Sequence, residues 1–265
     1  MKYLMSKYSI KVLAGAVLAM IVLVIFPYGA SASSETDMLW RKGNDAYSMG
    51  DYSDALENYL SIEKLDRVSE HLYFNIGNTY YKLGNTGKAI LYYERCLKLN
   101  PANQDASVNL EIARMGATDK IETIKGVIFV EWIRSIRNSF SSNQWCLGGF
   151  VLLLVTSLLF LVYRYFPVLG IRKFSFVLSC VFLAFAIMAF IFSASLKAVA
   201  NDMSYSIITA SHSNVKSAPN AIGNNLFILH TGTKVRTIES AGEWSRIELA
   251  DGRQGWITSA DIEQI

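Results

Sequence analysis

The sequence has few of the residues from which catalytic and metal sites are usually built. It contains three histidines and three cysteines, and neither set has the spacing of metal ligands. None of His71, His212 and His230 has a partnered nucleophile close by in the sequence, and no zinc-protease motif, nucleophile elbow or dinucleotide-binding loop occurs. We therefore expect a protein that is not an enzyme, with no catalytic residues, no metal and no cofactor.

The cysteines also argue against a disulfide framework. An odd number without regular spacing is not typical of a domain that disulfides hold together. Cys146 and Cys180 lie inside apolar runs, and Cys96 lies in a segment with helical periodicity. All three are predicted to be buried apolar side chains.

Charged residues are scarce, and the positive ones are concentrated beside apolar runs. Only 18% of the residues are charged whereas 52% are hydrophobic, which favours the membrane class. Residues 118–197 contain eight basic and three acidic residues, but residues 33–117 and 198–265 are both slightly acidic. Because a nucleic-acid-binding domain needs a basic folded surface, nucleic acid is not an expected partner.

The first 32 residues have the composition of a signal peptide. Three lysines precede an uncharged run from Val12 to Phe26, and Ala30-Ser31-Ala32 supplies the small residues of a cleavage site. As a helix the run would extend about 22 Å, less than the ~30 Å hydrocarbon core of a bilayer. We predict a signal peptide over residues 1–32, and an uncleaved anchor is the alternative.

Two longer apolar runs are predicted to be transmembrane helices. Residues 145–163 and 174–196 contain no charged side chain and no polar stripe. The loop between them, residues 164–173, carries Arg164, Arg172 and Lys173, and positive charge in a short loop indicates the cytoplasmic side. The signal peptide places residue 33 on the opposite side. We therefore predict an inner (cytoplasmic) membrane protein with both soluble domains in the periplasm.

Residues 118–144 are predicted to form an amphipathic linker before the first span. The stretch 127–137 mixes aromatic, aliphatic and arginine residues. A helix of this kind lies in the headgroup region of a bilayer, with its arginines directed at lipid phosphates. An ordinary linker helix packed on the first domain has the same composition, so both interpretations stay open.

Residues 36–103 contain two copies of a 34-residue pattern. Gly43 and Gly50 recur as Gly77 and Gly84, and the same shift relates further pairs: Ala55 and Ala89, Leu56 and Ile90, Tyr59 and Tyr93, Leu65 and Leu99. The second copy reads Tyr73-x-x-Ile76-Gly77-x-x-Tyr80, then Ala89-x-x-x-Tyr93, then Pro101, which resembles the tetratricopeptide repeat. The resemblance implies a repeat domain over residues 33–117, with repeats at 36–69 and 70–103 and a capping helix at 104–117.

Repeats of this family bind extended peptides in a concave groove that their first helices line. An asparagine there can bond a peptide backbone, and aromatic side chains supply apolar area. Trp40, Asp105 and Asn109 stand where a carboxylate-binding groove would carry basic residues, so a C-terminal carboxylate is not the expected ligand. Asn44 and Asn78 have an alternative role, which is to hold neighbouring helices. The resemblance implies a partner-binding groove made of Trp40, Asn44, Tyr47, Phe74, Asn78 and Tyr81.

Residues 208–265 have the alternating pattern of short strands. Apolar stretches near 226–229, 234–238 and 244–249 are separated by turn residues, and Asp251-Gly252 is predicted to form a hairpin turn. The segments Gly232-Thr233-Lys234-Val235 and Gly252-Arg253-Gln254-Gly255-Trp256-Ile257 resemble the bacterial SH3-like domain. Some such domains bind peptidoglycan peptides. Trp244 and Trp256 are assigned to the barrel core, with a ligand platform as the alternative.

The order of these parts predicts a multidomain membrane protein. It combines an all-α tetratricopeptide repeat solenoid, a two-helix transmembrane hairpin and a small all-β SH3-like barrel. From Leu39 to Ile265 this order, and Ser141-Ser142-Asn143-Gln144-Trp145 before the first span, resemble the BatE-type proteins of aerotolerance operons. The resemblance implies membrane partners with von Willebrand A domains, beside a MoxR-type ATPase, in an envelope stress complex.

Two functional hypotheses follow, and a third is weaker. In the first, the chain is a periplasmic scaffold that binds protein partners through the repeat groove. In the second, it is a peptidoglycan-binding anchor or envelope sensor that acts through the SH3-like domain, and the repeats are spacers. A signalling receptor is disfavoured because the short loop 164–173 has no room for an output domain.

Overall fold

A computed structural model of the chain describes residues 34–121 and 128–265; the predicted signal peptide, residues 1–32, lies outside the described residues. The described residues divide into two compact units. One, residues 140–197, is a helical hairpin. The other joins residues 34–139 to residues 198–265, and we refer to it as the repeat–barrel unit.

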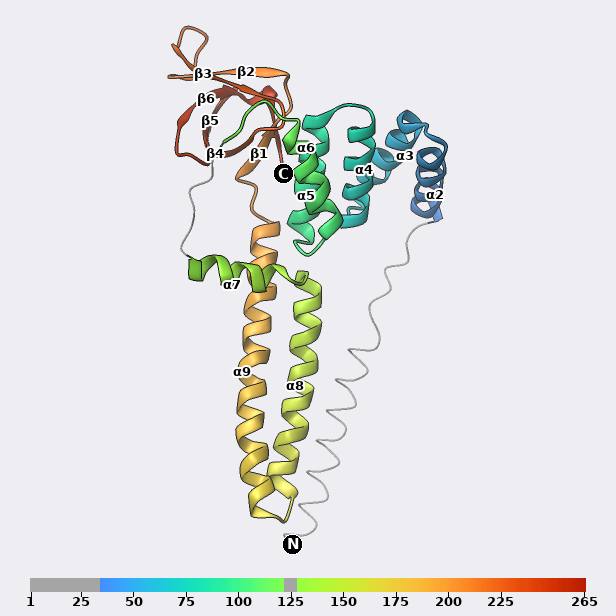
Figure 1. The fold of residues 1–265 in the computed structure, drawn as a ribbon, viewed down its shortest axis with the longest axis vertical. Helices are drawn as coiled ribbons and strands as arrows, with labels where there is room; N and C mark the ends of the chain where they lie inside the picture. Colours follow the sequence, from blue (N-terminus) through green and yellow to red (C-terminus); the bar gives the residue numbers. More distant parts are fainter. Residues whose placement is uncertain (1–33, 122–127) are drawn as a thin grey trace. The chain divides into compact units, whose positions relative to one another are not determined.

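Five helices form the repeat part of the repeat–barrel unit (Figure 1). The first four pair in sequence order, so that each repeat is one antiparallel helix pair, and the last helix packs on the second helix of the second repeat. Their bounds are α2 Ser34–Met49, α3 Tyr52–Lys64, α4 Glu70–Lys82, α5 Thr86–Leu99 and α6 Gln104–Met115.

Polar side chains cap the N-termini of four of these helices, and a glycine lies in the turn between the two helices of each repeat. Ser69 accepts a hydrogen bond from the Leu72 backbone N–H at 3.1 Å, and Asp51, Asn85 and Asn103 cap α3, α5 and α6 in the same way. Gly50 and Gly84, 34 residues apart, follow the first helix of each repeat with φ of 83° and 77°. Only glycine adopts this left-handed backbone without steric cost.

A second pair of glycines lets the helices of each repeat approach closely. A Cβ on Gly43 would lie 2.6 Å from a ring carbon of Tyr59, and one on Gly77 would lie 2.8 Å from the ring of Tyr93. Both tyrosines are 1% exposed. The two helices of each repeat therefore approach closely at equivalent positions, Gly43 and Gly77.

The C-terminal part is a seven-stranded antiparallel sheet with the strand order β3-β2-β6-β5-β4-β1-β7. Gly252, with φ of 88°, lies in the predicted turn between β5 and β6. The domain begins at Tyr205, three residues before the predicted boundary, because β1 pairs with both β4 and β7. The strands are β1 Tyr205–Ile208, β2 His212–Lys216, β3 Asn225–His230, β4 Lys234–Ala241, β5 Trp244–Glu248, β6 Gln254–Thr258 and β7 Ile262–Gln264.

The two tryptophans of this domain are not in its core, which corrects the assignment made from sequence. On β5 the buried residues are Ser245 and Ile247, so Trp244 points to the opposite face. Trp256 alternates with buried Gly255 and Ile257 on β6 in the same way. The core consists instead of aliphatic side chains: Ile208, Val215, Leu229, Val235, Ile247, Leu249 and Ile257.

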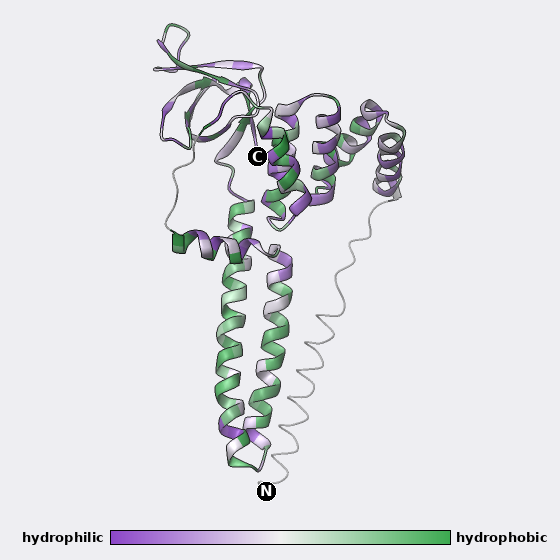
Figure 2. Ribbon diagram, in the orientation of Figure 1, coloured by the Kyte–Doolittle hydropathy of each residue, from purple (hydrophilic) through white to green (hydrophobic). Residues whose placement is uncertain are grey.

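The helical hairpin consists of α8 (Ser142–Tyr165) and α9 (Leu169–Ala200), both long and apolar enough to cross a membrane. Figure 2 shows the apolar colouring along both helices. Ser142 Oγ donates to the Ser193 carbonyl at 2.9 Å, and the Phe150 and Phe190 rings meet edge to face at 5.3 Å. Because α9 begins at Leu169, two of the three basic residues expected in the loop, Arg172 and Lys173, lie in its first turns.

The cysteines are buried only in part. Cys96 is buried in α5, and burial raises the pKa of its thiol to about 12. Cys146 is partly exposed on α8, and Cys180 is exposed on α9. The prediction of three buried cysteines is therefore confirmed only for Cys96, and it is wrong for Cys146 and for Cys180, which lies on the outside of the helical hairpin.

Helix α7 (Ile128–Asn138) has no buried residue. Ile128, Phe129 and Trp132 are 61–88% exposed, and Val130 and Ile133 are 49% and 37% exposed. Glu131 and Arg134 pair at 2.8 Å. A linker helix packed on the first domain would bury its apolar face, so this observation disfavours that interpretation.

Candidate partner-binding site

The repeat groove contains a pocket of about 230 Å³. Three of the six predicted groove residues line it, namely Tyr47 from α2 and Asn78 and Tyr81 from α4. The two tyrosines present aromatic surface, and Tyr81 is 43% exposed. The structure thus brings together one residue of the first repeat and two of the second as one concave site.

The other three predicted groove residues do not line this pocket. Trp40 packs on Tyr59 with ring centroids 5.8 Å apart, and Phe74 occupies the equivalent place on Tyr93 at 6.2 Å. Asn44 accepts a hydrogen bond from the Tyr59 hydroxyl at 2.7 Å. Trp40 and Phe74 are half-buried against the repeat core, so part of each ring serves packing.

Asn78 stands at the centre of a hydrogen-bond network that crosses the repeats. Its Oδ1 accepts from the Tyr93 hydroxyl at 2.8 Å and from Asn109 Nδ2 at 2.9 Å. Burial raises the pKa of Tyr93, so its hydroxyl stays protonated and donates. The alternative role of Asn78, holding neighbouring helices, is therefore present in the structure.

The same network leaves the amide nitrogen of Asn78 available. Both bonds go to Oδ1, and Nδ2 has no hydrogen-bond partner among the described residues. Because Tyr93 and Asn109 fix the orientation of the amide, its N–H groups are held in place beside the pocket. A peptide carbonyl is a suitable acceptor for such a donor.

Helix α6 contributes apolar residues that the sequence analysis did not identify. Ile112 lines the pocket beside Asn109, whose groove position the sequence indicated, and Val108, Ile112 and Met115 form an apolar stripe that is 45–77% exposed. A capping helix would present a polar outer face. The i, i+4, i+7 spacing of the stripe was visible in the sequence and predicts that α6 takes part in binding.

The SH3-like domain docks on α5 within the repeat–barrel unit. Arg95 Nη2 donates to the Gln264 carbonyl at 2.6 Å, Lys98 Nζ donates to the Ile265 carbonyl at 2.7 Å, and Lys88 pairs with Glu263. Ile207 and Ile265 join the hydrophobic core of the repeats. The barrel therefore completes the burial of the second repeat.

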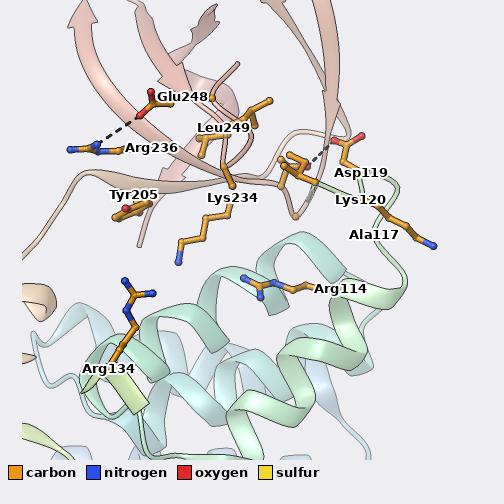
Figure 3. A pocket seen from close by; sticks show the side chains of 16 residues that line it. Arg114, Ala117, Asp119, Lys120, Arg134, Tyr205, Lys234, Arg236, Glu248 and Leu249 are labelled. Atoms are coloured by element: carbon orange, nitrogen blue, oxygen red, sulfur yellow. Dashed lines mark hydrogen bonds and ion pairs between the residues drawn. The ribbon is translucent and has the colours of Figure 1, made fainter. Parts of the chain in front are cut away.

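A second cavity, of about 910 Å³, lies within the repeat–barrel unit at the junction of α6, α7 and the barrel (Figure 3). Glu94 of α5 accepts from Lys234 Nζ at 2.7 Å and also pairs with Arg114. Asp119 accepts hydrogen bonds from the backbone N–H of His230 at 2.6 Å and from the Thr233 hydroxyl at 2.7 Å. Partial burial raises the pKa of Asp119, but these bonds and His230 outweigh it and hold the pKa below its usual value.

Comparison with known families identifies both soluble parts. Residues 72–103 match a family model described as tetratricopeptide repeat, and residues 43–84 match a second, described as TPR repeat. Residues 211–263 match the bacterial SH3 domain. The chain therefore contains tetratricopeptide repeats and a bacterial SH3 domain, which confirms these two predictions.

Two curated relatives are both photosystem I assembly proteins Ycf3. The protein from Rippkaea orientalis is 32% identical over 99 residues, which are 36% of this chain and 57% of the relative. That from Cyanophora paradoxa is 28% identical over 145 residues, which are 49% of this chain and 83% of the relative. The chain thus spans little more than half the length of the first relative.

Proposed function

We propose that this chain is a non-catalytic, membrane-anchored scaffold that holds an extended segment of a protein partner in its repeat groove. The observation that carries the proposal is the pocket of Tyr47, Asn78 and Tyr81. Its aromatic walls offer apolar area, and the oriented Asn78 Nδ2 offers a donor for a peptide carbonyl. Tetratricopeptide repeats commonly serve protein–protein interaction, and the arrangement here suits that role.

Anchoring in a membrane is part of the same proposal. Gly149 is the one buried residue of α8, so this apolar helix is not the core helix of a globular domain among the described residues. Exposed apolar side chains along α8 and α9 need a lipid environment, because water would leave them unfavourably hydrated. With the short basic connection on the cytoplasmic side, both soluble domains face the periplasm.

The partners follow from the resemblance to the BatE-type proteins. We propose that the groove binds a membrane protein with a von Willebrand A domain in a Bat/MoxR-type envelope complex. The likeness to two proteins named as photosystem I assembly proteins supports an assembly role. A scaffold of this kind needs no catalytic residue or cofactor.

The groove is tested by crosslinking and capture from intact membranes, with the full chain. The groove variant Tyr81→Ala/Ile112→Ala removes exposed pocket walls and leaves the Asn78 network intact. The matched control is Leu65→Ala/Leu83→Ala, because these side chains are similarly exposed, each 42%, and lie outside the pocket. We expect the groove variant to lose capture of a von Willebrand A membrane partner and the control to retain it. Equal capture by both variants would refute the groove as the binding site.

One observation favours the alternative, a peptidoglycan-binding anchor. Trp244 and Trp256 lie on the outer face of the SH3-like sheet, Lys216 Nζ lies 5.7 Å from the Trp244 ring centroid, and Arg246 is the cross-strand partner of Trp256. An aromatic surface with adjacent cations suits carboxylate-bearing wall peptides. Retention of the full chain on purified wall, lost in Trp244→Ala/Trp256→Ala, would support the anchor; no retention would eliminate it.

A further inference from the structure

The cavity between α6, α7 and the barrel is positively charged. Five cationic side chains line it, against the two carboxylates of Asp119 and Glu248. Figure 3 shows Arg114 from α6, Arg134 from α7 and Lys234 from β4 directed into the same space. The five are Arg114, Lys120, Arg134, Lys234 and Arg236.

The acidic groups near the cavity do not neutralise all of its positive charge. Glu94, which is 8% exposed, is shared by Arg114 and Lys234, so one carboxylate faces two cations. Asp119 is engaged by His230 and Thr233. Arg134 pairs with Glu131 at 2.8 Å and Arg236 with Glu248 at 3.8 Å, but both arginine side chains are more than half exposed, so these pairs are weak and an anion can compete with the carboxylates. The charge that remains attracts an anion.

The rest of the lining suits a ligand that is not purely ionic. Ile121, Leu249 and Ala250 supply apolar surface, and the Tyr205 ring lies 5.1 Å from Lys234 Nζ. The volume of about 910 Å³ is large for inorganic phosphate and is in the range of pockets that hold organic molecules. Arginine guanidinium groups bind phosphate oxygens in a bidentate manner.

Short stretches of chain connect the walls of this cavity to the apolar helices. Only four residues separate Ala200, the end of α9, from Tyr205 in the cavity wall, which is at most about 18 Å of extended chain. Helix α7, which contributes Arg134, ends at Asn138, and α8 begins at Ser142. In a membrane-anchored chain, the cavity is therefore within reach of the lipid headgroups.

We propose that this cavity binds the phosphate-bearing headgroup of an anionic membrane lipid. Arg134 and Arg236 contact the phosphate oxygens. Arg114 and Lys234, which Glu94 holds in place, add positive charge to the cavity wall. The bound headgroup would hold the repeat–barrel unit against the bilayer surface. The proposal rests on the membrane anchoring proposed above, but it concerns a site separate from the repeat groove.

The test uses the full chain in a neutral detergent and counts bound lipids by native mass spectrometry. Phosphatidylglycerol is titrated against wild type and the cavity variant Arg134→Gln/Arg236→Gln. The control Arg41→Gln/Arg67→Gln also loses two exposed arginines of the repeat–barrel unit, and neither of them lines the cavity or lies on α7. We expect one phosphatidylglycerol molecule to bind tightly to the wild type. Its affinity should be about tenfold or more lower in the cavity variant and unchanged in the control.

Three outcomes would overturn the proposal. Equal weakening in both double variants would mean that only general surface charge attracts the lipid. Binding of phosphatidylcholine with equal affinity would mean that the site does not select an anionic headgroup. Displacement of the lipid by an equal concentration of inorganic phosphate would identify free phosphate as the ligand. Each outcome leaves membrane anchoring intact, because anchoring is judged separately by whether the chain sediments with membranes.

Discussion

The two repeats have one sequence pattern but differ sharply in burial. Helix α3, the second helix of the first repeat, buries three residues, whereas α5, its equivalent, buries eight. The reason is that α5 packs against α4 and α6 on one side and against the barrel on the other. The pattern decides how helices pair within a repeat, and the neighbouring domain decides how stable each pair is.

Equivalent positions of the two repeats carry different residues where α5 meets the barrel. Ser53 and Glu57 of α3 are exposed, but their equivalents 34 residues later, Gly87 and Leu91, are buried. A Cβ on Gly87 would lie 2.0 Å from Thr231 Oγ1. The second repeat is thus adapted to contact with the barrel.

The largest expected effect comes from Ile90→Ala compared with Leu56→Ala. Ile90 is fully buried, and its Cδ1 lies against Gly232 of the barrel, whereas Leu56 is half-buried. We expect Ile90→Ala to lower the local free energy of opening of α5 by about 2–5 kcal/mol. Leu56→Ala should lower that of α3 by roughly 1 kcal/mol. Hydrogen exchange of the full chain, resolved by mass spectrometry, measures both opening free energies. Equal losses of free energy in α5 and α3 would contradict a contribution of the barrel to the stability of α5.

A smaller effect is expected from a single methyl group at the docking surface. Gly87→Ala places its Cβ against Thr231, and we expect a cost of about 1–3 kcal/mol, seen as faster exchange in both α5 and β1. Ser53→Ala in α3 is the matched control and should change neither. Adding Thr231→Ala to Gly87→Ala should recover part of the loss, and no recovery would mean that this contact is not the cause.

Equivalent tyrosine hydroxyls make hydrogen bonds of different burial in the two repeats. Tyr93 and Tyr59 each donate to an asparagine, but Asn78 is half-buried and Asn44 is exposed. Water can replace the hydroxyl at Asn44 in Tyr59→Phe. We therefore expect Tyr93→Phe to cost about 1 kcal/mol and Tyr59→Phe less, by thermal unfolding in detergent. An equal or larger cost for Tyr59→Phe would contradict this account.

Much of the fold could be predicted from the sequence, because it depends on spacing along the chain. The pairs Gly43–Tyr59 and Gly77–Tyr93 recur at a fixed interval, and the turn at Gly252 is a local signal. The outward direction of Trp244 was also readable, since it alternates with the buried Ser245 and Ile247. It was misassigned because large aromatic side chains are usually expected in a core.

The candidate sites could be predicted only in part. Tyr47, Asn78 and Tyr81 follow from the repeat, but Asn109 joins them through a bond to the next repeat. The junction cavity depends on pairs such as Glu94–Lys234, 140 residues apart, for which a single sequence has no periodic signal. A comparison of Ser53 with Gly87 and of Glu57 with Leu91 would have indicated that α5 has an additional neighbour.

The smallest expected effect concerns acid stability at the junction that distinguishes the second repeat. Hydrogen bonds from His230 and Thr233 hold the pKa of Asp119 below the value of about 3.9 for an unfolded aspartate, although partial burial opposes this. The stabilisation is therefore complete above that value and is lost as the pH falls through the folded-state pKa. Thermal unfolding should show Asp119→Asn less stable than wild type at pH 6, and this difference should shrink as the pH falls below about 3.9. Other carboxylates titrate in both proteins, so the difference isolates Asp119. A difference that stays constant over that range would contradict a role for its charge.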